Sequence, residues 1–225
     1  MQYYNLKLIV MPKTEINSNS AYEKISKLIA KAMLQYDDLK ELHEKNEYKN
    51  YVFCNLYPVE KDGVYKTDKL YTFDIRFIDL KMAMKIKQKI EKVDSDFKII
   101  MTNIQTNTQR KITKLITLTP SIITTETGSY KISEDMEFVK KRMLDNIQKK
   151  YNNIFDTDIK EDFIKNVKQT NLKPIKIPYK NINLLGNKFE IEVKEDPISQ
   201  NLAYLALSIG LLEKNALGFG FCRAI

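Results

Sequence analysis

The sequence contains a single histidine, His43, so at most one imidazole can take part in proton transfer or metal binding. Sites built on two or three histidines, such as those of H-E-x-x-H proteases and His-rich zinc hydrolases, cannot be assembled from it. The chain also lacks the G-x-x-x-x-G-K-[ST] phosphate-binding loop, the G-x-S-x-G nucleophile motif and an EF-hand calcium loop. Any chemistry must therefore use one imidazole or none.

The two cysteines, Cys54 and Cys222, are far apart in the sequence and form no C-x-x-C pair. Neither a cysteine-based zinc site nor a disulfide framework is expected from this spacing. We predict that both side chains are small buried hydrophobes, and that the protein uses no metal ion and no cofactor.

The charge balance favours an acidic partner. The 225 residues include 37 Lys and Arg against 29 Asp and Glu, a formal net charge of +8. A surplus of cations displaces the counterions condensed on phosphates, which favours nucleic acid. No apolar run approaches the roughly 20 residues of a membrane span, and the first residues do not resemble a secretory signal. We therefore expect a cytoplasmic protein without a membrane partner.

The first half of the chain shows alternating strand and helix patterns. Apolar residues that recur every three or four positions predict helices, whereas short runs of β-branched and aromatic residues predict strands. The predicted strands cover residues 3–10, 51–57, 70–77 and 97–104, and the predicted helices cover 21–36 and 79–91. Residues 37–49 are expected to form a charged connection, and 105–109 a linker. The order β-α-β-β-α-β over residues 1–105 predicts a ferredoxin-like domain.

The second half, residues 111–225, repeats this order. We predict a strand within 112–125, a helix over 134–151, and a helix that begins at Asp196-Pro197 with an N-cap and a proline in its first turn. A hairpin is expected with its turn at Gly186-Asn187, between 182–184 and 189–193, and a last strand over 217–224. The predicted fold class is α+β, with two tandem ferredoxin-like (RRM-like, βαββαβ) domains, whose sheets commonly present an open face to RNA.

Three of the six glycines, Gly210, Gly218 and Gly220, lie near the C-terminus. A dinucleotide-binding G-x-G-x-x-G is excluded because Arg223 occupies the third glycine position and no helix follows. Alternating glycines in a strand would let a ligand approach the backbone, so that N–H groups could bind phosphate oxygens. The alternative is a tight turn from helix to strand that packs against the other domain.

The sequence resembles the CRISPR-associated endoribonuclease family that processes precursor CRISPR RNA. The resemblance spans essentially the whole chain. It rests on the two tandem units, on the run Thr119-Pro120-Ser-Ile-Ile, and on the terminal motif that extends from Gly210 through Glu-Lys-Asn to Gly218-Phe-Gly220-Phe. The chain departs from the fuller family motif at Leu212, where many members carry another glycine.

The resemblance implies cleavage within CRISPR repeats without a metal ion. The 2′-hydroxyl next to the scissile phosphate would be the nucleophile, and a cyclic phosphate the product. His43 lies where the family's catalytic histidine is commonly found, and Lys49, six residues later, would stabilise charge on the phosphate. Tyr36 is the first candidate for a third catalytic residue and Tyr22 the second. Gly210, Gly218 and Gly220 are the candidate RNA-binding residues.

The implied partner is CRISPR repeat RNA, and other subunits of a CRISPR interference complex are candidate partners. The alternative is a repeat RNA-binding subunit of the same fold that does not cleave. An unrelated ferredoxin-like enzyme acting on a small molecule is disfavoured, because the sequence shows no other cluster of residues that would mark its pocket.

Overall fold

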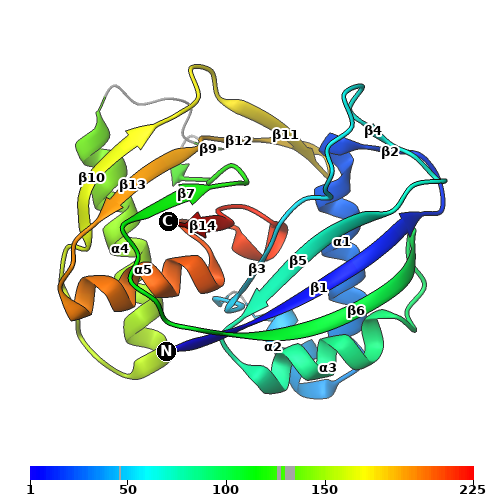
Figure 1. The fold of residues 1–225 in the computed structure, drawn as a ribbon, viewed down its shortest axis with the longest axis horizontal. Coiled ribbons are helices and arrows are strands. Elements are labelled where there is room, and N and C mark those ends of the chain that lie inside the picture. Colours follow the sequence, from blue (N-terminus) through cyan, green and yellow to red (C-terminus); the bar gives the residue numbers. More distant parts are fainter. Residues whose placement is uncertain (46, 126–127, 130–134) are drawn as a thin grey trace.

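The first half of the chain forms a four-stranded antiparallel sheet covered on one face by helices (Figure 1). The computed structural model describes residues 1–45, 47–125, 128–129 and 135–225. The strand order is β3-β5-β1-β6, which is the ferredoxin-like order of second, third, first and fourth strand. The elements are β1 (Gln2–Pro12), α1 (Ser18–Met33), α2 (Asp37–Glu44), β3 (Tyr51–Phe53), β5 (Tyr71–Phe77), α3 (Leu80–Ile90) and β6 (Phe97–Thr108), with a small pair formed by β2 (Ile16–Asn17) and β4 (Val64–Tyr65).

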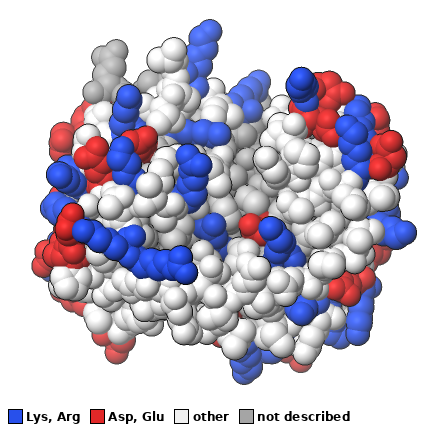
Figure 2. Space-filling model, viewed as in Figure 1, with Lys and Arg blue, Asp and Glu red and all other residues white. Residues whose placement is uncertain are grey.

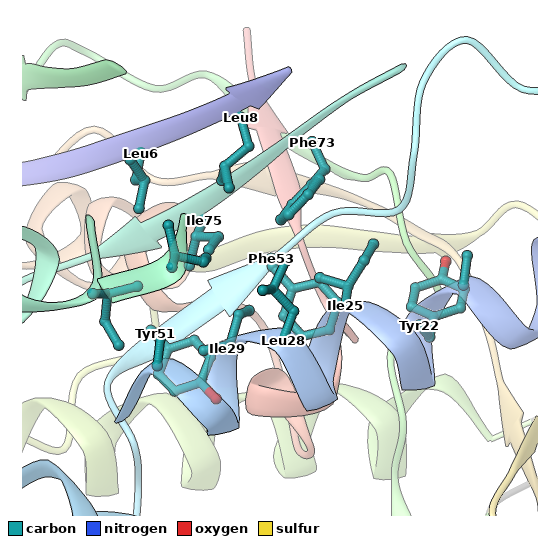
Figure 3. Close-up of a cluster of buried hydrophobic side chains, with 14 of the residues drawn as sticks. Leu6, Leu8, Tyr22, Ile25, Leu28, Ile29, Tyr51, Phe53, Phe73 and Ile75 are labelled. Atoms are coloured by element: carbon teal, nitrogen blue, oxygen red, sulfur yellow. The ribbon is translucent and has the colours of Figure 1, made fainter. Parts of the chain in front are cut away.

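The core of this domain lies between the sheet and α1. Alternate residues of β5 are buried, as expected for a strand with one covered face. Figure 3 shows side chains from three strands meeting the apolar stripe of α1. The labelled residues are Leu6, Leu8, Tyr22, Ile25, Leu28, Ile29, Tyr51, Phe53, Phe73 and Ile75. The other face of the sheet carries no helix of this domain. Its polar residues in β5 are half-buried, because part of this face packs against the second domain.

The second half of the chain repeats this topology. Its main sheet has the order β10-β13-β7-β14, again second, third, first and fourth, with α4 and α5 packed against it. The tandem ferredoxin-like architecture is therefore confirmed. The elements are β7 (Lys114–Thr117), β8 (Thr124–Thr125), β9 (Gly128–Ser129), α4 (Met136–Phe155), β10 (Ile164–Gln169), β11 (Ile175–Tyr179), β12 (Ile182–Gly186), β13 (Phe189–Val193), α5 (Pro197–Ile209), the short 3-10 helix η1 (Asn215–Leu217) and β14 (Cys222–Ala224).

Several local predictions hold in detail. Asp196 caps α5, because its Oδ1 accepts a hydrogen bond from the Ser199 backbone N–H at 2.9 Å, and Gly210 ends that helix with a φ of 92°. Both cysteines are free thiols; Cys222 is buried as predicted, whereas Cys54 is only half-buried. The predicted helix over 134–151 corresponds to α4, although Glu134 lies outside the described residues.

The predicted hairpin at Gly186-Asn187 is wrong. Strand β12 pairs with β11, and β13 pairs with β10, so the two flanking segments are not partners. Asn187 instead exchanges two backbone hydrogen bonds with Ser121, at 2.8 and 3.0 Å. A Cβ at Gly186 would lie 2.8 Å from the Cβ of Pro120, so this glycine permits close packing of two segments and forms no turn.

Two other boundaries also differ. Strand β6 continues to Thr108 because residues 105–108 pair with residues 2–5 of β1, so most of the predicted linker at 105–109 is strand. The predicted last strand over 217–224 is mostly not strand. Within this range only β14 is strand, and it pairs with β7. Gly218 and Gly220 adopt φ values of 92° and 73° in the preceding loop. Such values are incompatible with an extended backbone.

Arg76 of β5 joins the two domains. Its Nη1 donates hydrogen bonds to the carbonyl oxygens of Leu207 (2.9 Å) and Cys222 (2.7 Å), both in the second domain. Its guanidinium carbon also lies 3.9 Å from the ring centroid of Phe221. The planar guanidinium can stack and donate at the same time, which a lysine cannot do.

We expect Arg76→Met to lower the free energy of unfolding by about 2–4 kcal/mol, because two enclosed carbonyl groups lose their donor. Arg76→Lys should recover less than half of this loss, since it keeps the charge but not the stacked plane. Chemical denaturation of the two variants measures both values. Equal stability of Arg76→Met and the unchanged protein would contradict the role of Arg76 as a junction residue.

Candidate functional site

His43 lies in the last turn of α2, an eight-residue helix in the segment predicted as a charged connection. That prediction of a connection is wrong. Leu39 is buried beneath the helix, the side chain of Asp38 pairs with Lys85 of α3, and Asp37 and Asp38 occupy the first turn, where carboxylates are favourable. The His43 side chain is exposed, and its imidazole makes no hydrogen bond with any residue that the structure describes.

Lys49 closes the C-terminal end of α2. Its ammonium donates to the carbonyl oxygen of His43 at 3.1 Å and also to those of Leu42 and Lys45. These carbonyls have no partner within the helix, so the lysine supplies a cationic cap where the helix dipole is negative. Burial lowers the pKa of Lys49. The structure thus brings Lys49 to the backbone of His43.

Neither candidate tyrosine lies beside the imidazole. Tyr36 is the N-cap residue of α2, about 10 Å from His43 along the helix axis at 1.5 Å per residue. Its hydroxyl donates to Gln88 Oε1 at 2.8 Å, so it faces α3. Tyr22 is buried in α1 and stacks on Phe219, with 5.4 Å between ring centroids. Desolvation raises the pKa of Tyr22.

The glycine-rich loop, residues 210–221, packs in the junction between the two domains. All three candidate glycines are buried. The Gly210 N–H donates to Ala206 O at 3.0 Å, that of Gly218 to Asn215 O at 2.9 Å, and that of Gly220 to Pro120 O at 2.9 Å. A Cβ at Gly218 would lie 2.6 Å from Phe53 and 2.8 Å from Tyr22. The structure therefore places these glycines in internal packing, with their N–H groups already bonded to protein.

Leu212 occupies the loop position at which the sequence departs from the glycine of the motif it resembles. Its φ is 60°, in the left-handed region that glycine adopts most easily. The side chain is 1% exposed, so apolar burial offsets the backbone strain. The loop keeps the backbone conformation that a glycine would provide at this position.

The buried side chain of Lys150, in α4, forms hydrogen bonds with this loop. The side chain is 1% exposed, and its ammonium donates to Gly210 O (3.0 Å), Leu212 O (2.7 Å) and Asn215 Oδ1 (2.7 Å). The Asn215 amide in turn donates to the carbonyl oxygens of Leu211 (3.1 Å) and Phe219 (2.9 Å). The three N–H donors of the ammonium each have one of these acceptors. The buried cation is therefore fully hydrogen-bonded without a carboxylate.

The protonation of Lys150 should make stability depend on pH. Burial lowers its pKa to about 7, whereas the unfolded chain binds this proton up to a pH of about 10.4. Between these values the unfolded state holds more protons, so this group makes the free energy of unfolding rise with pH, by at most about 1.4 kcal/mol per pH unit. Urea unfolding of the protein and of Lys150→Met at pH 7, 8 and 9 should show the smaller slope in the variant. Parallel slopes would contradict this prediction.

A cavity of about 370 Å³ lies between the segment after α2, helix α4 and the glycine-rich loop. Tyr48 and Lys49 line it on one side, and Arg142, paired with Glu213, lines it on the other. Burial raises the pKa of Tyr48, and the negative charge of Glu213 adds to the shift. Lys49 therefore both lines the cavity and caps the helix that carries His43.

The opposite side of the junction carries a larger groove of about 650 Å³. Its walls are the open face of the first sheet and the edge of the second domain, and it contains Lys7, Lys188 and Tyr57. A neighbouring hollow of about 540 Å³ contains three of the four arginines, Arg76, Arg110 and Arg223. In the view of Figure 2, Lys and Arg side chains lie on both halves of the molecule, with Asp and Glu side chains among them.

The second half of the sequence matches a protein-family model. Residues 101–224, more than half of the chain, match the family described as CRISPR associated protein Cas6, C-terminal. The chain belongs to the Cas6 family. Cas6-type proteins act on CRISPR repeat RNA, so this chain belongs to a family that binds and processes such RNA. No curated protein sequence matches the chain.

Solved structures of the Cas6 family share the fold over the whole chain. A CRISPR associated protein Cas6 is 18% identical, with a TM-score of 0.74 and 99% of each chain covered. The product of a Cas6-related gene from Pyrococcus furiosus is 17% identical, with a TM-score of 0.75 and coverage of 99% of this chain and 98% of that one. A RAMP protein described as binding different RNA substrates is 14% identical, with a TM-score of 0.78 and 99% of each chain covered. These likenesses establish the fold.

Sequence reasoning missed several residues of the cavity and the loop. Lys150 is one of many lysines, and only its burial distinguishes it. Tyr48 follows α2 in a polar segment without periodicity. Helix α2 could have been predicted from the sequence. Two aspartates precede Leu39 and Leu42, and Glu41 and Lys45 form an i,i+4 pair.

Within the described ranges, no group of three or more His, Cys, Asp or Glu side chains could hold a metal ion. Among the helices in the same part of the chain, none is long and apolar enough to cross a membrane.

Proposed function

We propose that this protein cuts precursor CRISPR RNA within its repeats and that His43 is its catalytic proton carrier. The observation that carries the proposal is the position of the single imidazole. It is exposed on a helix that is fixed at both ends, by Tyr36 and Asp38 to α3 and by Lys49 at the C-terminal end. An imidazole can accept or donate a proton at neutral pH.

The reaction needs a proton acceptor, a proton donor and stabilisation of negative charge. The 2′-oxygen loses its proton and attacks the adjacent phosphorus, the bond from phosphorus to the 5′-oxygen breaks, and the leaving oxygen takes up a proton. His43 performs one of the two proton transfers. Lys49 fixes the backbone of His43 and adds positive charge near it, so we assign it a positioning role. Tyr36 and Tyr22 are not needed in this scheme.

We further propose that the RNA strand reaches this site across the basic groove on the open sheet face. Sheets of this fold bind single-stranded RNA on such faces, by stacking bases on aromatic rings and pairing phosphates with cations. Tyr57 is 68% exposed, and Lys7 and Lys188 lie in the same groove. The buried glycines contribute by shaping the junction that joins this face to the cavity side.

The proposal predicts cleavage of cognate repeat RNA in excess EDTA. A repeat with a 2′-deoxy sugar just upstream of the scissile phosphate should remain uncut, because it lacks the nucleophile. Gel analysis of the products, with detection of a 2′,3′-cyclic phosphate, measures both outcomes. Loss of cutting in EDTA that magnesium restores, or cutting of the 2′-deoxy substrate, would contradict the mechanism.

A second candidate function is binding of repeat RNA without cleavage. Neither candidate tyrosine is placed to act as a second proton carrier beside His43, since Tyr36 donates to Gln88 and Tyr22 is buried. Tight binding of repeat RNA together with no cleavage of it across pH 6–8 would favour this function over the nuclease.

A further inference from the structure

The cavity beside α2 has the size of a site for one small ligand. Its volume of about 370 Å³ lies in the range of about 300–1,000 Å³ that is typical of small-molecule sites. It is built from three separate parts of the chain, residues 47–51, α4 and the glycine-rich loop. The loop wall is fixed by the Lys150 ammonium, so the cavity is formed before any ligand arrives.

Two asparagine side chains in the cavity wall have unsatisfied oxygens. The Oδ1 atoms of Asn50 and Asn146 are enclosed, and neither accepts a hydrogen bond from any residue that the structure describes. Asn146 is 8% exposed. Buried polar groups without a partner are rare in folded proteins and call for an explanation. Because the amide oxygen and nitrogen occupy equivalent positions, a half-turn presents either of them to a ligand.

An aromatic ring and two unpaired cations complete the lining. Tyr48 is 36% exposed, and the Lys150 ammonium lies 5.7 Å from its ring centroid. The side chains of Lys149 and Lys214 are exposed and form no hydrogen bond or ion pair with the described residues. A ring can stack on a nucleobase, and flanking lysines can pair with its phosphates. An asparagine amide pairs with a base that presents an amino group next to a ring nitrogen.

We propose that this cavity binds one unstacked nucleotide of the RNA substrate, with an adenine or cytosine base read by the Asn146 amide and stacked on Tyr48. Adenine and cytosine share the required edge, an amino donor beside a ring-nitrogen acceptor, whereas uracil lacks it. This inference rests on the proposed function, because it assumes an RNA substrate. It assigns base selectivity to a position next to the helix that carries His43.

Equilibrium binding of single-stranded oligomers tests the inference without mutation. Fluorescence anisotropy would compare 12-mers of adenosine, cytidine, uridine and purine riboside, the last of which lacks the adenine amino group. We expect the adenosine or the cytidine 12-mer to bind about tenfold more tightly than the uridine 12-mer. If adenine is the base, purine riboside should bind as weakly as uridine. If it is cytosine, the cytidine 12-mer alone should show the preference.

Variants locate the preference in the cavity. Asn146→Ala should reduce the tenfold preference to twofold or less and leave binding of the uridine 12-mer unchanged. Asn153→Ala is the matched control, because Asn153 is an exposed residue of the same helix. Tyr48→Leu should weaken binding of all 12-mers by about tenfold, and Tyr48→Phe should restore it. A melting temperature for each variant identifies any loss of fold.

The possible outcomes separate this inference from the proposed function. Equal affinity of all four oligomers for the unchanged protein would overturn the base-reading pocket but leave RNA binding intact. A preference that survives in a folded Asn146→Ala variant would also overturn it. If Asn146→Ala does not fold, the purine riboside and cytidine comparisons decide. Absence of binding to every oligomer and to repeat RNA would overturn the proposed function itself.

Discussion

Replacing His43 by alanine is expected to slow cleavage of cognate repeat RNA by about 100-fold or more, with repeat affinity changed no more than a few-fold. A positioned proton carrier typically contributes about 10²–10⁴ to the rate. The side chain is exposed on α2 and makes no hydrogen bond with the described residues, so its removal should leave the fold intact. Single-turnover cleavage rates and binding curves on the same preparation measure the two effects.

Two further variants test whether the loss of cleavage is specific to the His43 side chain. Glu44→Ala changes an exposed neighbour in the same helical turn and should cleave at the normal rate. Lys49→Ala removes the cap of α2 and should slow cleavage by less than His43→Ala does, with partial rescue by Lys49→Arg. Full activity of His43→Ala would remove His43 from the site. Equal losses of binding and cleavage in Lys49→Ala would make Lys49 a phosphate contact.

Replacing Gly220 by alanine is expected to destabilise the protein by about 3 kcal/mol or more. The glycine has a φ of 73°, and an added Cβ would overlap the carbonyl oxygen of Leu211, a backbone atom that cannot move aside cheaply. The Leu211 N–H also donates to Gly220 O at 2.9 Å, so a shift of either residue breaks a buried hydrogen bond. The melting temperature and the urea midpoint should both fall.

Gly63→Ala is the matched control for backbone strain. Gly63 has almost the same φ, 72°, but its added Cβ would meet only Ser18 Oγ at 3.5 Å. This variant should lose only about 1–2 kcal/mol, the cost of a left-handed alanine. Similar losses in the two variants would show that the loop relaxes around the new methyl group. Normal stability together with weaker repeat binding in Gly220→Ala would instead indicate RNA contact by the glycine.

The sequence by itself determined the order of the principal strands and helices and the fold class, and the resemblance of its terminal glycine motif indicated the family. These features depend on local patterns that single residues encode, such as the apolar periodicity of α1, the Asp196-Pro197 start of α5 and the glycine that ends it. The absence of a second histidine also needs no structure. Each of these inferences uses contacts within a few residues along the chain, or a count.

Only the tertiary structure decided which residues share a site. Gly186-Asn187 has the sequence of a hairpin turn, but pairing with Ser121, 66 residues away, takes its backbone hydrogen bonds. Lys150 is indistinguishable from the other lysines until helix α4 buries it against the glycine-rich loop. The cavity around Tyr48 and Asn146 exists because both domains close around that loop. Long-range packing energy overrides local preference at such positions, because each buried hydrogen bond and apolar contact there depends on a partner that is distant in sequence.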